Sequence, residues 1–213
     1  MEMTLPPVET VDFVDLERYD GLWYEVARTP NIFQVGCSCV TATYEVIDDS
    51  SISIFNSCNR GGPRGPQITI DGVGVVTNPE TNAELEIFFE GSNFGEEYWI
   101  LDLVEDPADP EGDYTYAVIG DSDRDFLFII ARTPIADPEV LEDIYAGLEA
   151  QFYDTDRLIT SRQYPRLCGC SDTSDLSMAL GKTEKYEQLL DIFPELSSAS
   201  VTDSLKTAEA FII

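Results

Sequence analysis

The sequence predicts an all-β fold, a barrel or sandwich of antiparallel strands, and three observations lead to that prediction. Eight short runs between residues 21 and 133 are rich in Val, Ile, Thr, Tyr and Phe, which suit a half-buried pleated sheet. The segments between these runs are rich in Gly, Pro, Asn, Asp and Ser, which favour turns. No helical stretch separates the runs, whereas a parallel sheet needs crossover helices.

The eight predicted strands follow one another along the chain. They cover residues 21–29, 39–47, 51–58, 67–76, 83–90, 97–104, 114–120 and 125–133. In the fifth run, Leu85 and Ile87 alternate with glutamates, so this strand has one apolar face and one charged face. Short strands at this spacing are typical of a closed barrel or a sandwich.

One helix is predicted after the eighth strand. Asp137 is a natural N-cap, and Pro138 fits the first helical position. Apolar residues then recur at helical spacing: Leu141, Ile144, Tyr145, Leu148 and Phe152. We expect this stripe to pack against the sheet, and we expect residues 156–163 to form a short ninth strand.

The charge balance excludes several classes of function. The chain has 41 acidic and 12 basic residues and a formal net charge of −29, so it repels nucleic acid and anionic lipid headgroups. The acidic residues are scattered, which favours a role in solubility over a specific acidic binding face. Histidine, the commonest general base and metal ligand, is absent. We therefore expect no catalytic residue, no metal site, no cofactor and no nucleic-acid partner.

The sequence contains no obvious membrane or targeting segment. No window approaches the roughly 18 apolar residues that a membrane helix needs. The first ten residues lack the basic start and apolar run of a signal peptide. Either the protein stays where it is made or a leader has been removed. We expect membrane association only through such a leader or through a partner, and the oligomeric state is not predicted.

Five cysteines lie at positions 37, 39, 58, 168 and 170. Their spacing does not match a zinc site, and there is no histidine to complete one. Their grouping at two distant places favours disulfides, with buried free thiols as the alternative. Disulfides favour an oxidising compartment, such as the extracellular space, the periplasm or the plastid lumen. Because five is odd, one thiol should remain free.

Three short motifs resemble the signatures of the lipocalin family in their order and spacing. They are Gly21-Leu22-Trp23, Asp113-Tyr114 and Arg132. The resemblance covers roughly residues 10–165 and is marked for the branch that contains apolipoprotein D and the bacterial outer-membrane lipocalins, through YWILDLV and DFLFIIARTP. The pair of cysteines in Cys37-Ser38-Cys39 instead resembles the chloroplast lipocalins of plants.

This resemblance implies both a fold and a function. The fold would be an eight-stranded antiparallel up-and-down barrel with one C-terminal helix, wide enough for one small ligand. The protein would bind and carry or scavenge a small hydrophobic molecule such as a lipid, sterol or carotenoid. Trp23 would close the barrel floor with Arg132 stacked on its ring, and Gly21, Asp113 and Tyr114 would complete this structural motif.

The ligand-binding residues are expected on the inner face of the barrel. The resemblance to the apolipoprotein D branch implies Tyr44, Asn56, Phe89 and Phe128 at these positions. Strand alternation then adds Ile54, Ile87 and Ile130. This set is apolar and aromatic with a few neutral polar groups, which is the usual composition of a small-molecule pocket. Simple filling of the core is the alternative role for any one aromatic residue.

The same resemblance implies a disulfide pattern. Cys39 would bond to Cys168 or Cys170 and so tie the second strand to the segment after the ninth. Cys37 and Cys58 would form a second bridge, because the hairpin turning at residues 48–51 brings Cys58 opposite this region.

Two further possibilities concern function and domain organisation. The alternative function is an enzyme on the same scaffold, related to the cysteine-dependent violaxanthin de-epoxidase. We expect residues 1–170 to form the lipocalin domain and residues 171–213 to form a helical extension. That extension also weakly resembles the start of a fasciclin-like domain, which would favour an adhesion or surface protein.

Overall fold

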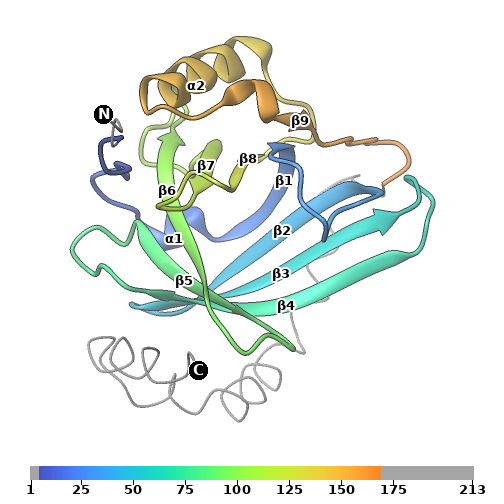
Figure 1. Ribbon diagram of the computed structural model, residues 1–213, viewed down its shortest axis with the longest axis horizontal. Helices are drawn as coiled ribbons and strands as arrows, with labels where there is room; N and C mark the ends of the chain where they lie inside the picture. The colour runs from blue at the N-terminus through green and yellow to red at the C-terminus, as the bar shows by residue number, and fades with distance from the viewer. Residues whose placement is uncertain (1–4, 169–213) are drawn as a thin grey trace. The chain divides into compact units, whose positions relative to one another are not determined.

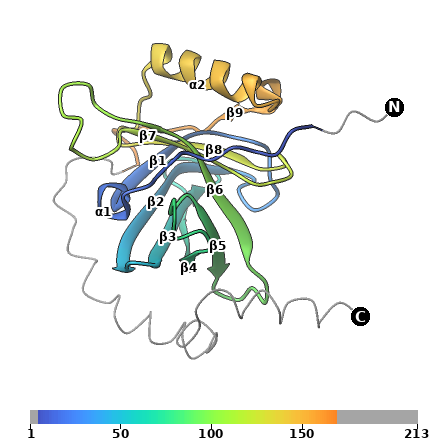
Figure 2. The same cartoon turned by 90° about the vertical axis from the view of Figure 1, so that its left-hand side faces the viewer.

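The computed structural model describes residues 5–168, so the predicted extension at residues 171–213 lies outside the described residues, and so does Cys170. Figures 1 and 2 show a curved sheet wrapped into a barrel, with a helix across its outside. The elements in chain order are α1 (Leu16–Tyr19), β1 (Gly21–Arg28), β2 (Cys37–Asp48), β3 (Ser51–Arg60), β4 (Gln67–Val76), β5 (Glu84–Phe89), β6 (Glu96–Val104), β7 (Tyr116–Gly120), β8 (Leu127–Ala131), α2 (Pro138–Ala150) and β9 (Ile159–Thr160).

The strands form a closed antiparallel barrel. Each of β2 to β8 pairs with its neighbour in the chain, β8 pairs with β1, and β1 also pairs with β2. This last pairing closes the sheet and leaves no open edge among the eight strands. The eight predicted strands and the up-and-down barrel are therefore confirmed.

Strand direction gives the barrel two different ends. The loops at residues 29–36, 61–66, 90–95 and 121–126 join strands at one end, which we call the mouth. The remaining connections lie at the other end, which we call the floor. Because up-and-down strands alternate in direction, every second loop returns to the same end.

Side chains on the two faces of the sheet form two separate cores. The inner core fills the barrel and includes Trp23, Tyr44, Leu85 and Ile100. The outer core lies between α2 and the wall formed by β6, β7, β8 and β1. The predicted alternation therefore places one apolar set inside the barrel and another under the helix.

Helix α2 starts as predicted but ends earlier. The Asp137 carboxylate accepts a hydrogen bond from the Glu139 amide at 2.9 Å, and Pro138 is the first helical residue. Ile144 and Leu148 are buried against the barrel. Phe152 was predicted to continue this stripe, and that prediction is wrong. Phe152 lies beyond the last turn, has a φ of +67° and is 55% exposed.

The ninth strand is also shorter than predicted. Of residues 156–163, only Ile159 and Thr160 pair with β1, and a 3-10 turn at Thr155–Arg157 precedes them. The next residues continue without regular structure and stay bonded to the barrel, since the Ser161 amide donates to the Val26 carbonyl. Within residues 5–168, no helix has the length and apolar character to cross a membrane.

Candidate functional site

The floor of the barrel is built on Trp23. Its side chain is fully buried, and its indole Nε1 donates to the Tyr19 carbonyl at 2.8 Å. The Arg132 guanidinium lies over the Trp23 ring, 3.9 Å from its centroid. A cation held against an indole face is stabilised by the quadrupole of the ring, and the stacked pair excludes water from the floor.

Arg132 also satisfies the backbone around the floor. It donates to the carbonyls of Tyr114 at 3.1 Å, Leu22 at 3.1 Å and Asp20 at 2.7 Å. Gly21 has a φ of +100°, and a Cβ added there would approach Arg132 Nη1 to 3.2 Å. A glycine therefore suits this position both for its backbone conformation and for the close approach of the arginine.

The Asp113-Tyr114 motif lies at the same end. Tyr114 is buried, its hydroxyl accepts a hydrogen bond from the Asp15 amide at 3.1 Å, and the Arg18 guanidinium lies 4.2 Å from its ring centroid. Asp113 is exposed, and its charge acts on Arg132. All five predicted motif residues therefore lie at the floor, away from the mouth.

Three tyrosines form a polar layer directly above the floor. The hydroxyls of Tyr19 and Tyr98 are 2.7 Å apart, and Tyr98 donates to Tyr44 at 2.8 Å. Burial raises the pKa of Tyr44 to about 12, so its hydroxyl stays protonated at physiological pH. This layer offers neutral hydroxyl groups to the interior and no charge.

The predicted ligand residues lie on the inner face of the barrel wall. Tyr44, Ile54, Ile87 and Ile130 belong to the buried inner core, and Phe89 and Phe128 are partly buried against it. Asn56 lies opposite Ala42 of β2 and Ile70 of β4. Residues directly opposite in an antiparallel pair share a face, and Ala42 packs on the inner core. The structure therefore brings all seven residues to one surface, and whether they contact a ligand stays a prediction.

The solvent exposure of this inner surface increases from the floor to the mouth. Trp23, Leu85 and Ile100 near the floor are almost completely buried. Ile68 and Ile70 of β4 lie opposite Cys58 and Asn56 on the same face, and they are 37% and 40% exposed. The barrel is thus packed at its base and keeps accessible apolar surface toward its mouth.

The prediction from sequence missed Ile68 and Ile70 as inner residues. The same alternation that identified Ile87 could have found them, because residues 67–76 step inward at Ile68, Ile70, Gly72 and Gly74. At Gly72 an added Cβ would lie 2.8 Å from the Phe89 ring. The glycine therefore leaves room for the side chain of Phe89 inside the barrel.

The side chain of Asn56 brings a polar atom without a hydrogen-bond partner to this surface. Asn56 Oδ1 is buried and accepts no hydrogen bond in the described structure. A buried carbonyl oxygen without a donor costs free energy, which a donor from water or from a ligand removes. Asn56 therefore offers an unused hydrogen-bond acceptor on the inner face of the barrel.

An ion pair inside the upper barrel was also missed. Glu25 lies opposite Ile130 and Arg28 opposite Phe128, so both charged side chains share the inner face. A register shift between Glu25 and Ala27 makes this possible for residues three apart. Arg28 Nε is 3.2 Å from Glu25 Oε1, and both side chains are buried. Simple alternation along β1 cannot reveal a bulge.

Neighbouring residues complete this buried polar cluster. Gln34 donates to Glu25 Oε2 at 2.6 Å, and the Ser161 hydroxyl donates to Glu25 Oε1. The Arg28 guanidinium donates to the carbonyls of Thr29 and Gln34 at 3.1 and 3.4 Å. Burial raises the pKa of Glu25 above its ordinary value. With Glu25 ionised the pair is neutral overall, and Arg28 is already engaged.

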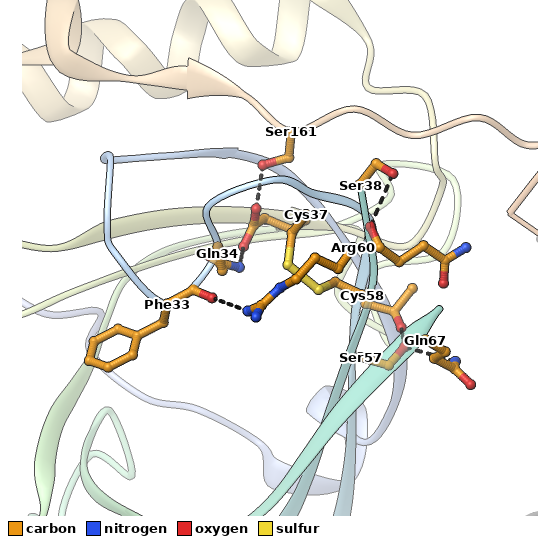
Figure 3. Close-up of a disulfide and its surroundings, with 12 residues drawn as sticks. Phe33, Gln34, Cys37, Ser38, Ser57, Cys58, Arg60, Gln67 and Ser161 are labelled. Atoms are coloured by element: carbon orange, nitrogen blue, oxygen red, sulfur yellow. Dashed lines mark hydrogen bonds between the residues drawn. A yellow bond between two sulfur atoms is a disulfide. The ribbon is translucent and has the colours of Figure 1, made fainter. Parts of the chain in front are cut away.

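Two disulfides brace the mouth. The bond between Cys37 and Cys58 joins β2 to β3 and is shown in Figure 3, so this predicted bridge is confirmed. The structure also bonds Cys39 to Cys168, one of the two partners expected for Cys39. Cys39 has a φ of +56°, and its amide donates to the Arg162 carbonyl. The final described segment is therefore held against β2 both covalently and by hydrogen bonds.

Comparisons with known proteins agree with this architecture. Residues 14–163 match the family described as lipocalin-like domain. The chain is 32% identical over 160 residues to the outer membrane lipoprotein Blc of Escherichia coli K12, covering 74% of this chain and 85% of that protein. It is 27% identical over 165 residues to mouse apolipoprotein D, covering 74% of this chain and 80% of that protein.

A solved structure supports the fold independently. Insecticyanin of the tobacco hornworm Manduca sexta superposes with a TM-score of 0.57 over 78% of this chain and 89% of its own, at 18% sequence identity. At this level of identity the similarity shows the barrel architecture alone.

Proposed function

Because the chain belongs to the lipocalin family, we propose that it binds one small, neutral lipophilic molecule inside its barrel and acts as a carrier or scavenger rather than an enzyme. The observation that carries this proposal is the rise in solvent exposure of the inner apolar side chains from the floor of the barrel to its mouth. The base is closed by Trp23 and Arg132, whereas Ile68 and Ile70 leave accessible apolar surface near the mouth. An apolar molecule entering there would lose contact with water on all sides but one.

The charges around this surface favour an uncharged ligand. Arg28 on the inner face is paired with Glu25 and bonded to two carbonyls, so it offers no free counter-charge to a carboxylate. Burying an unpaired anion is costly, and the formal net charge of −29 would repel it at the mouth. Asn56 Oδ1 and the tyrosine layer suit a ligand with a hydroxyl group, such as a sterol, a hydroxylated carotenoid or a monoacylglycerol.

The disulfides support an oxidising compartment. We propose the extracellular space, the periplasm or the plastid lumen, since disulfides persist in such places. The bacterial relatives are named as outer membrane lipoproteins, which agrees with a location outside the cytoplasm.

Within residues 5–168 nothing favours the alternative of a cysteine-dependent enzyme. All four cysteines in this range are bonded in disulfides, so none is a free thiol.

Competition binding tests the ligand class. A fluorescent lipophile is displaced from the full chain by oleate or by monooleoylglycerol at neutral pH and low salt. We expect the neutral monoacylglycerol to compete better than the anionic fatty acid. Clear preference for oleate would contradict the proposed electrostatics, and failure of every lipophile to bind would contradict the proposed function.

Two substitutions locate the site. Tyr44→Ala and Phe128→Ala should weaken binding, because both residues lie on the inner surface. Glu86→Ala is the control on strand β5, where Glu86 alternates with the inward residues Leu85 and Ile87. Equal loss of affinity in all three variants would place the ligand elsewhere.

A further inference from the structure

A set of large apolar side chains is exposed around the mouth of the barrel. Ile32 and Phe33 are 81% and 68% exposed, which is unusual for such residues in a chain with a quarter of its residues charged. We call the following set the rim: Ile32, Phe33, Val35, Phe94 and Phe126. Its members come from the three mouth loops at residues 29–36, 90–95 and 121–126.

Hydrogen bonds connect the loops that carry the rim. The Leu127 amide, next to Phe126, donates to Thr29 Oγ1 at 3.1 Å, and the Thr29 amide donates back to the Leu127 carbonyl. The Ser122 amide and hydroxyl both donate to Glu97 at 2.8 and 2.6 Å, which joins the loop of Phe126 to the strand that follows Phe94. The rim is therefore one connected border around the mouth.

The first loop holds its polar groups inward and its apolar groups outward. Residues 29–36 contain no charged residue. The Asn31 and Gln34 side chains bond to each other at 2.6 Å, and Gln34 also reaches the buried Glu25. This is the reverse of an ordinary surface loop, where apolar side chains turn inward and polar ones face water.

The base of this loop is fixed, so the exposure of its apolar residues is built into the fold. Cys37 is bonded to Cys58 directly after the loop, and the Gly61 amide donates to the Gly36 carbonyl at 2.8 Å. Arg60 donates to the Phe33 carbonyl at 3.1 Å. Figure 3 shows the Phe33 ring pointing away from the disulfide while its carbonyl faces Arg60.

We propose that the rim docks onto a lipid surface with zwitterionic headgroups, such as a phosphatidylcholine bilayer. Single apolar side chains that project from loops suit insertion among lipid headgroups. There each side chain is buried without needing a protein surface of complementary shape. Aromatic rings at this depth also attract quaternary ammonium groups. The sequence alone predicts membrane association only through a leader or a partner, and the rim would be a third route.

The charges on the neighbouring loops select the kind of surface. Asp123 and Asp125 are exposed beside Phe126, while Arg64 is exposed on the mouth loop at residues 61–66. A zwitterionic headgroup offers a partner to both signs. An anionic membrane would instead meet a molecule with a formal net charge of −29, and so would a second copy of this chain.

Vesicle flotation tests the proposal on the full chain without added ligand. We expect the wild type to float with phosphatidylcholine vesicles and to bind less to vesicles that contain phosphatidylglycerol at low salt. The combined change Ile32→Ser and Phe33→Ser should lower the partition coefficient about tenfold or more, because two inserted side chains are lost. Neither substitution changes the net charge.

The matched control removes the same two residue types elsewhere. Phe13 and Ile135 are 57% and 71% exposed and lie toward the floor, where the Val14 amide donates to the Thr81 carbonyl and β8 ends at Ala131. Phe13→Ser with Ile135→Ser should float like the wild type.

Other outcomes would overturn the proposal. A wild type that stays in solution would show that the rim does not dock on lipid. An equal loss of vesicle binding in the rim and control variants would show that the rim is not the binding surface. Stronger binding to anionic vesicles would contradict the proposed preference for zwitterionic headgroups. A dimer that Ile32→Ser and Phe33→Ser dissociate would make a second copy the occupant. None of these measurements depends on a ligand inside the barrel, so they leave the proposed carrier function untouched.

Discussion

Trp23 closes the barrel through contacts that no other residue type provides. Its ring fills the floor, its Nε1 bonds the Tyr19 carbonyl, and its face supports Arg132. Trp23→Ala should reduce the free energy of unfolding by about 3–5 kcal/mol, the usual cost of truncating a buried large aromatic. Urea denaturation measures this loss. Leu22→Ala is the control, because the side chain of Leu22, next to Trp23 in the chain, is 44% exposed.

The same variant separates a structural role from a binding role. Ligand affinity should fall only to the extent that the variant is unfolded. If Trp23→Ala kept the stability of the wild type but lost ligand binding, Trp23 would line the ligand site instead of closing the floor.

Glu25 should make stability depend on pH. Because burial raises its pKa in the folded protein, the folded state holds the proton more tightly than the unfolded state. Its contribution to stability is therefore fully present below the unfolded pKa of about 4.3 and is lost as the pH rises through the folded pKa. Glu25→Gln removes this titration.

Thermal denaturation of the wild type and Glu25→Gln at several pH values measures the effect. The stability of the variant relative to the wild type should be greatest at neutral pH and should shrink toward pH of about 4. A constant difference would show that Arg28 balances the effect of burial, and a difference that grows toward acid would show that Arg28 stabilises the carboxylate more than burial destabilises it.

At the scale of elements, strands were predictable wherever the period of two was regular. The predicted fifth strand, at residues 83–90, agrees with β5 at Glu84–Phe89 to within one residue at each end. The prediction failed where tertiary contacts decide. Phe152 fits the helical period, but the backbone turns at a positive φ before reaching it. The ninth strand is short because β2 pairs with β1 at residues 21–24, and β9 pairs only with Ala27 and Arg28 at the other end of β1.

Candidate site residues show the same division. Tyr44 and Phe128 were placed through the family resemblance, and alternation extended the set correctly to the inner face at Ile54 and Ile130. Glu25 follows the inward Trp23 at the alternating spacing and could have been found, whereas Arg28 lies inside only because of a bulge in β1 after Glu25. Only the register with β8 reveals this, and a single sequence contains no direct record of register.

The two disulfides should differ in their contribution to stability. The bond between Cys39 and Cys168 spans 129 residues in sequence, whereas that between Cys37 and Cys58 spans 21. In the chain-entropy description, closing a loop of about 15 residues stabilises by about 3 kcal/mol and one of about 100 residues by about 4.7 kcal/mol. Replacing the long-range pair by serine should therefore cost about 1–2 kcal/mol more than replacing the short-range pair.

Urea denaturation of the two double-serine variants tests this order. Cys170→Ser is included in both variants and in the reference protein, so that this thiol cannot substitute for a missing partner. A larger loss from the Cys37 and Cys58 pair would show that bracing the mouth matters more than constraining the unfolded chain.

At the scale of the whole molecule, the formal net charge of −29 affects both the choice of binding partners and the stability of the fold. It opposes binding of anionic lipids and of a second copy, which is why we propose neutral lipophiles for the apolar interior and zwitterionic surfaces for the rim. The charged groups themselves are scattered, so their effect on stability is collective.

This collective repulsion should make the folded protein more stable as salt is added. Two like charges about 10 Å apart in water repel by about 0.4 kcal/mol, and folding brings many such pairs together. The Debye length falls from about 30 Å at 0.01 M salt to about 3 Å at 1 M, so sodium chloride should raise the melting temperature steeply at first and then level off. Choline chloride should act equally, because screening depends on ionic strength. A melting temperature that stays constant or falls over this range would mean that favourable contacts already offset the repulsion between the acidic residues.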